Sequence, residues 1–131
     1  MTENVLIKDF NISTHIFKEL KKLGIKIALD DFGTGYSSIN YLSQLPIDYI
    51  KIDRSFISKA GQDGFNGVIL AITSMAKSLG VKTVAEGVEN KEQLKLLRNL
   101  GCNEFQGYFF SKPIDLEEFR RNFNSLNKIK I

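Results

Sequence analysis

Residues 25–38 read IKIALDDFGTGYSS, an apolar run followed at once by two acids and a turn that contains two glycines. The run Ile25–Leu29 is short and β-rich, as expected of a strand, and Asp30–Gly35 has the composition of a loop. Glycine in such a loop permits backbone conformations that other residues avoid. The stretch therefore predicts a strand whose carboxyl end carries acidic groups.

On both sides of this stretch, short β-rich runs alternate with amphipathic helices. A first helix is expected at residues 11–23, ended by Gly24, with the apolar stripe Ile12, Ile16, Leu20 and Leu23. Further helices are expected at residues 37–42, 65–79, 91–100 and 116–126, strands at 49–52, 81–85 and 104–105, and a polar surface loop at 58–66. Such alternation predicts an α/β fold with parallel strands and helical crossovers, either an open doubly wound sheet or a (β/α) barrel.

The polar residues at the strand ends favour the barrel. Each expected strand ends close to functional groups, which are Asp30 and Asp31, Lys51 and Asp53, Glu86, and Gln106 in chain order. In a closed barrel the carboxyl ends of all the strands converge on one mouth, where such folds build their sites. An open sheet would spread the same groups along an edge.

The number of strand–helix units is too small for a complete barrel. We count about four and a half units, whereas a full barrel has eight in roughly 250 residues. We therefore interpret residues 1–131 as the second half of a TIM-like barrel and as part of a single domain, with Glu3 at the end of a further strand. An isolated half would leave two strand edges unpaired unless missing residues or a second chain complete it.

Composition excludes several classes of protein. The 18 basic and 15 acidic residues alternate along the chain and give a net charge of only +3, which argues against binding a nucleic acid polymer. Cys102 is the single cysteine, so an internal disulfide and a multi-cysteine zinc site are excluded. No apolar run approaches the roughly 18 residues of a spanning helix, and we expect a cytoplasmic segment without membrane contact.

The carboxylates and the lysine at the expected barrel mouth suit a divalent-metal site that acts on a phosphate ester. Oxygen ligands favour Mg²⁺ or Mn²⁺ over softer metals, and a cation beside Asp30 and Asp31 would remove their mutual repulsion. Lys51 could orient a nucleophile or neutralise charge on the phosphate. Two alternatives remain open, because Asp30 and Asp31 could serve only in a turn, and Glu86 and Glu89 could be first-turn acids of the following helix.

Several motifs in one order resemble the EAL-domain family of cyclic di-GMP phosphodiesterases. Each motif is weak alone, but together they cover nearly the whole chain. They are DDFGTGYSS at residues 30–38, LPID at 45–48, KID at 51–53, VAEGVE at 84–89 and QGY at 106–108.

The resemblance implies a TIM-like barrel that linearises cyclic di-GMP to pGpG with two Mg²⁺ or Mn²⁺ ions. It implies that Glu3, in a segment similar to the family's Thr-Glu-Ser, is a metal ligand. It further implies that Asp30 is the carboxylate shared between the metals and that Asp31 is a ligand of the second metal. Lys51 is similar to the lysine that contacts the nucleophilic water.

The same resemblance assigns roles to the remaining motifs. It implies that Asp53 supports the catalytic site, that Glu86 is a metal-linked or general-base glutamate, and that Gln106 holds a metal-bound water or the substrate. It also implies a homodimer, in which the loop after the first strand couples dimerisation to metal binding. That regulatory loop consists of Phe32, Gly33, Thr34, Gly35, Tyr36, Ser37 and Ser38.

One departure from the family pattern qualifies these expectations. The namesake Glu-Ala-Leu motif and a downstream asparagine ligand belong to the first half of the family's barrel, and neither is in this sequence. The residues present therefore cannot supply a full two-metal shell. Three hypotheses follow: part of an active enzyme with upstream sensory or cyclase domains, a module that binds the nucleotide or a protein without turnover, or an inert fragment or assembly of chains through open strand edges.

Overall fold

The computed structural model describes residues 10–33 and 42–126 and contains a four-stranded parallel sheet in the order β1-β2-β3-β4. Its elements are α2 (Phe10–Lys22), β1 (Ala28–Phe32), β2 (Tyr49–Ile52), α4 (Arg54–Ile57), α5 (Phe65–Ser78), β3 (Lys82–Glu86), α6 (Lys91–Asn99), β4 (Glu104–Gln106) and α7 (Leu116–Leu126). Among these described helices, none combines the length and the hydrophobicity needed to cross a bilayer.

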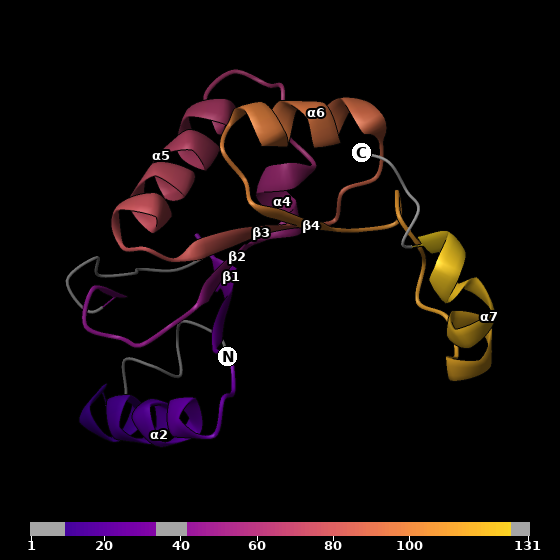
Figure 1. Ribbon diagram of the computed structural model, residues 1–131. Coiled ribbons are helices and arrows are strands. Elements are labelled where there is room, and N and C mark those ends of the chain that lie inside the picture. The colour runs from indigo at the N-terminus through magenta and orange to yellow at the C-terminus, as the bar shows by residue number, and fades with distance from the viewer. Residues whose placement is uncertain (1–9, 34–41, 127–131) are drawn as a thin grey trace.

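Every strand pairs in parallel with the next strand along the chain, which confirms the predicted α/β fold. Helices α5 and α6 lie together on one side of the sheet, as Figure 1 shows. The strands lie in consecutive order, as in a segment of a barrel wall. The carboxyl ends of the four described strands consequently lie along one edge.

The core lies between the sheet and the helices that cover it. Alternate strand residues point into it, because successive side chains of a strand face opposite sides. Burial of each large aliphatic side chain contributes roughly 1.5–3 kcal/mol. The buried strand residues include Leu29, Ile50, Ile52 and Ala85, and the helices contribute Ile69, Ile72, Ala76, Leu94 and Leu97.

The first strand begins and ends later than the sequence predicted. Residues 25–29 were expected, but β1 spans Ala28–Phe32, since backbone groups of the preceding residues are already bonded elsewhere. The Ile25 N–H donates to the carbonyl of Leu20 and so ends α2, with Gly24 at a φ of 78°. The Ile27 N–H donates to the Asp48 carboxylate. Asp30 and Asp31 therefore lie within the strand and not in a loop after it.

The chain after β2 also differs from the prediction. The short helix α4 precedes the expected polar loop and was not predicted, because four residues cannot show helical periodicity. Its amino end is capped by Asp53, whose carboxylate accepts a hydrogen bond of 2.8 Å from the Ser55 N–H. The Phe56 ring lies so close to Gly33 that a Cβ there would be 2.9 Å from it. Helix α4 thus packs against the end of β1.

The apolar stripe expected on the first helix is largely exposed. Ile12 and Ile16 are 56% and 49% exposed, and α2 instead inserts Phe17 into the core. In the part of the chain that the structure describes, β1 is the outermost strand of the sheet and has no neighbour on its outer side. Of the four residues of the expected stripe, only Leu20 packs against the core, whereas Ile12, Ile16 and Leu23 are exposed.

Asp48 ties the end of α2 to the beginning of β2, and we expect it to govern stability in acid. Burial opposes ionisation of its carboxyl, but hydrogen bonds from Lys21, the Ile27 N–H and Lys26 outweigh that effect and lower the pKa of Asp48 to about 2. A carboxyl whose pKa is depressed on folding stabilises the fold above its unfolded pKa of about 3.9, and this contribution disappears as the pH falls toward 2.

We therefore predict that Asp48→Asn lowers the free energy of unfolding by on the order of 1 kcal/mol at pH 7, after allowance for solvent screening, and by much less at pH 2. Urea denaturation at both pH values measures the difference. Glu19→Gln is the matched control, because its ion pair with Lys22 is exposed on both sides. Equal losses at pH 7 and pH 2 would contradict the role of Asp48.

Candidate functional site

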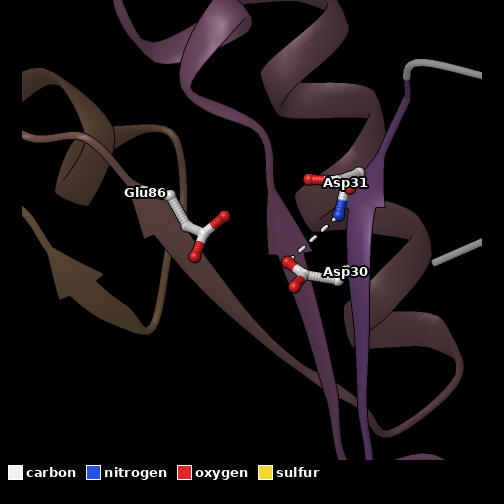
Figure 2. Close-up of side chains that lie close together, drawn as sticks. All are labelled: Asp30, Asp31 and Glu86. Carbon is white, nitrogen blue, oxygen red and sulfur yellow. Dashed lines mark hydrogen bonds between the residues drawn. The ribbon is translucent and has the colours of Figure 1, made fainter. Parts of the chain in front are cut away.

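The predicted site residues of three neighbouring strands meet at the carboxyl edge of the sheet. Asp30 and Asp31 come from β1, Lys51 from β2 and Glu86 from the end of β3. Figure 2 shows the Glu86 carboxylate directed from β3 toward the two aspartates of β1. Parallel pairing in register produces this meeting, because Lys51 lies opposite Val84, two residues before Glu86.

Lys51 lies between two of the carboxylates. Its Nζ is 2.9 Å from Asp30 Oδ1 and 2.6 Å from Glu86 Oε1. Burial opposes the charge on the amine, but the hydrogen bonds to Glu86 and Asp30 outweigh burial and raise the pKa of Lys51. The hydrogen bond from Lys51 in turn lowers the pKa of Asp30. The lysine and Asp30 are therefore both ionised at neutral pH.

Asp31 adopts a backbone conformation that few residues other than glycine adopt. Its φ is 55°, and the register of β1 against β2 shifts between Leu29 and Phe32. Aspartate tolerates this left-handed region better than most residues do. The Asp31 N–H donates to Asp30 Oδ1 at 3.2 Å, as the dashed line in Figure 2 shows. The bulge brings two successive carboxylates to the same edge, which a regular strand would place on opposite faces.

Asp30, Asp31 and Glu86 form a group suited to a metal ion. Each offers one carboxylate oxygen, and these oxygens lie within 4.8 Å of one another. Hard oxygen donors are the ligands that Mg²⁺ and Mn²⁺ prefer, so the donor chemistry fits the expected cofactor. The ammonium of Lys51 neutralises part of this negative charge. A bound cation must therefore compete with Lys51 for Asp30 and Glu86.

The other predicted site residues are placed less directly. Asp53 follows β2, but its carboxylate caps α4, and the Ser55 hydrogen bonds lower the pKa of Asp53. Gln106 is exposed at the end of β4, beside Glu86 in the register. Phe32 is buried in the core, and Gly33 follows it with a φ of 99°. Glu3 and residues 34–38 of the expected regulatory loop lie outside the described residues.

A groove of about 230 Å³ runs alongside Glu86. Two of its lining residues, Arg54 and Tyr108, are not among the predicted site residues, and Tyr108 is 57% exposed. The sequence indicated this groove only indirectly, through a glycine directly after Glu86 and another directly after Gln106. The groove is lined by Arg54, Glu86, Gly87, Glu89, Gln106, Gly107 and Tyr108.

Residues 1–113 match the family described as the EAL domain. The chain is 44% identical over 128 residues to the cyclic di-GMP phosphodiesterase NbdA of Pseudomonas aeruginosa, covering 94% of this chain and 16% of NbdA. It is 41% identical over 119 residues to the bifunctional diguanylate cyclase/cyclic di-GMP phosphodiesterase MucR of the same species, covering 90% of this chain and 17% of MucR.

Solved structures give the same result. The MucR phosphodiesterase in complex with c-di-GMP superposes with a TM-score of 0.85 at 40% identity, covering 91% of this chain and 49% of the MucR chain. The manganese and c-di-GMP complex of BlrP1 from Klebsiella pneumoniae has a TM-score of 0.77 at 34% identity, covering 86% of this chain and 29% of that chain. This chain thus spans about half of the solved MucR chain and under a fifth of the full-length relatives. The chain belongs to the EAL domain family of cyclic di-GMP phosphodiesterases and spans part of such a domain.

Proposed function

We propose that this chain forms part of a phosphodiesterase that hydrolyses cyclic di-GMP to pGpG with the help of two Mg²⁺ or Mn²⁺ ions. The observation that carries the proposal is the convergence of Asp30, Asp31 and Glu86 around Lys51. The relatives with c-di-GMP in their names or complexes support the choice of substrate.

The carboxylates of Asp30, Asp31 and Glu86 would hold a metal ion, with Glu3 as a further ligand. A bound divalent cation polarises a phosphoryl oxygen and lowers the pKa of a water molecule, which makes hydroxide available at neutral pH. Lys51 stays protonated beside these carboxylates and would orient the nucleophilic water or offset charge on the phosphate.

As the alternative to binding the metal, Glu86 would serve as the general base that accepts a proton, and Gln106 would hold a water molecule or the substrate from the neighbouring strand. Asp53 would support the site through α4, whose amino end it caps. We further propose that the regulatory loop at residues 32–38 couples assembly of a homodimer to metal binding, and that sensory or cyclase domains accompany this segment in a longer protein.

The test is incubation of the purified 131-residue chain with cyclic di-GMP and Mn²⁺ or Mg²⁺. Chromatography follows pGpG, and calorimetric titration reports binding in parallel. We expect binding of the metal and, if the residues present suffice, turnover that EDTA abolishes. Binding of cyclic di-GMP without turnover would favour the second candidate, a nucleotide-binding module. Failure to bind either the metal or the nucleotide would refute the proposal for these residues.

A further inference from the structure

Arg54 packs directly over the glycine that follows Glu86. Gly87 has a φ of 76°, and a Cβ at this position would lie 2.5 Å from Cγ and 2.9 Å from Cδ of Arg54. The aliphatic part of the arginine therefore fills the space that a side chain at position 87 would occupy. Only glycine satisfies both the backbone conformation and this contact.

The guanidinium of Arg54 reaches a second residue of the same segment, residues 86–89, which form the turn between β3 and α6. Its Nη2 lies 2.5 Å from Oε1 of Glu89, and the Glu89 N–H donates to Gln93 Oε1 at the first turn of α6. Arg54 thus links the start of α4 to the segment that joins β3 with α6. Within residues 86–89, this one side chain lies against Gly87 and pairs with Glu89.

The same turn is also held by the end of β4. The Val88 N–H donates to the carbonyl of Gln106 at 3.0 Å, and Val88 is fully buried. The turn after Glu86 is therefore clamped between β4 and Arg54. Glu86, the last residue of β3, directly precedes Gly87 and the rest of this turn.

We infer that Arg54 is a positioning residue, which holds the turn at residues 86–89 and thereby keeps the Glu86 carboxylate against Lys51 and the two aspartates. This inference rests on the proposed function, since it concerns the same carboxylates. Arg54 and Glu89 are 63% and 47% exposed, and ion pairs with such exposure contribute little to folding stability. A role in placing Glu86 would account for the close packing of Arg54 against Gly87, where a Cβ would collide with the arginine.

Electrostatics and positioning predict opposite effects of Arg54→Ala on Mn²⁺ binding. Removal of a nearby positive charge would by itself strengthen the binding of a cation. Loss of positioning would weaken it, and outer residues that orient metal ligands change affinity by about tenfold or more. We therefore expect Arg54→Ala to bind Mn²⁺ about tenfold more weakly, measured from the electron paramagnetic resonance signal of free Mn²⁺.

Two further variants test the mechanism. The double substitution R54E/E89R keeps the net charge and can restore the link across the turn, so we expect its Mn²⁺ affinity to return to within about threefold of the original, whereas Arg54→Glu alone stays weak. Lys82→Ala is the matched control, because Lys82 and Glu104 form a pair that is 60% and 44% exposed at the other end of β3. Its Mn²⁺ affinity should be unchanged.

Amide hydrogen exchange at Val88 provides a readout that needs no metal. Arg54→Ala should speed this exchange by about tenfold, while Lys82→Ala should not. Unchanged or stronger Mn²⁺ binding by Arg54→Ala would overturn the inference. If the unmodified chain binds no Mn²⁺, the metal site of the proposed function fails, and Val88 exchange then decides the inference: faster exchange in Arg54→Ala supports it, and unchanged exchange overturns it.

Discussion

Replacing Asp30 by asparagine is expected to lower the Mn²⁺ affinity of the chain by about 100-fold. Outer-shell changes alone cost about 10- to 100-fold in metal affinity, and loss of a charged ligand should cost at least as much. The substitution keeps the shape of the side chain but changes the charge of the group formed with Asp31, Glu86 and Lys51 from −2 to −1. It also frees Lys51 to pair more closely with Glu86, which competes further with the metal.

Calorimetric titration of Mn²⁺ measures this effect, and Asp63→Asn is the matched control. Asp63 is an exposed aspartate in the segment before α5, where the same loss of charge should leave the affinity unchanged. If the chain, alone or within a longer protein, forms pGpG, Asp30→Asn should also abolish that activity. Metal affinity equal to that of the original chain would contradict the assignment of Asp30 as a ligand, even if the stability of the variant were reduced.

The sequence was sufficient to predict the order of the four described strands and of the longer helices, and it identified the three carboxylates that meet at the sheet edge. Strand β2 begins and ends at the predicted residues 49–52, and α6 begins at the predicted residue 91. Asp30, Asp31 and Glu86 meet because each lies at or near the carboxyl end of a parallel strand. Hydrophobic periodicity and parallel pairing thus determine which residues share an edge, before any side-chain geometry is known.

What could not be predicted depends on tertiary contacts. The positive φ of Asp31 arises where β1 shifts register against β2, and no residue pattern marks that shift. The link from Arg54 to Glu89 joins residues 35 positions apart. A sequence read segment by segment assigns Glu89 to its own helix and overlooks Arg54, because local patterns contain no information about which turns face each other.

A second large effect is expected at Gly107, where alanine should destabilise the fold by about 3 kcal/mol or more. A Cβ at Gly107 would collide with the backbone nitrogen and oxygen of Val88. These atoms cannot move aside, because the Val88 N–H donates to Gln106 and its carbonyl accepts from the Phe109 N–H. The substitution must therefore separate β4 from the turn after Glu86, and it should weaken Mn²⁺ binding as well as folding.

Urea denaturation followed by circular dichroism measures the free energy of unfolding, and Gly67→Ala is the control. Gly67 lies on the exposed side of α5, and a methyl group added there would meet no atom within 4 Å, so alanine should stabilise the helix by about 1 kcal/mol. The same change from glycine to alanine thus lowers the free energy of unfolding at Gly107 and raises it at Gly67, because only Gly107 lies against another segment of backbone. A Gly107→Ala variant as stable as the original chain would show that Val88 and Gly107 are not in contact, and the clamp on the Glu86 turn would then lack its β4 side.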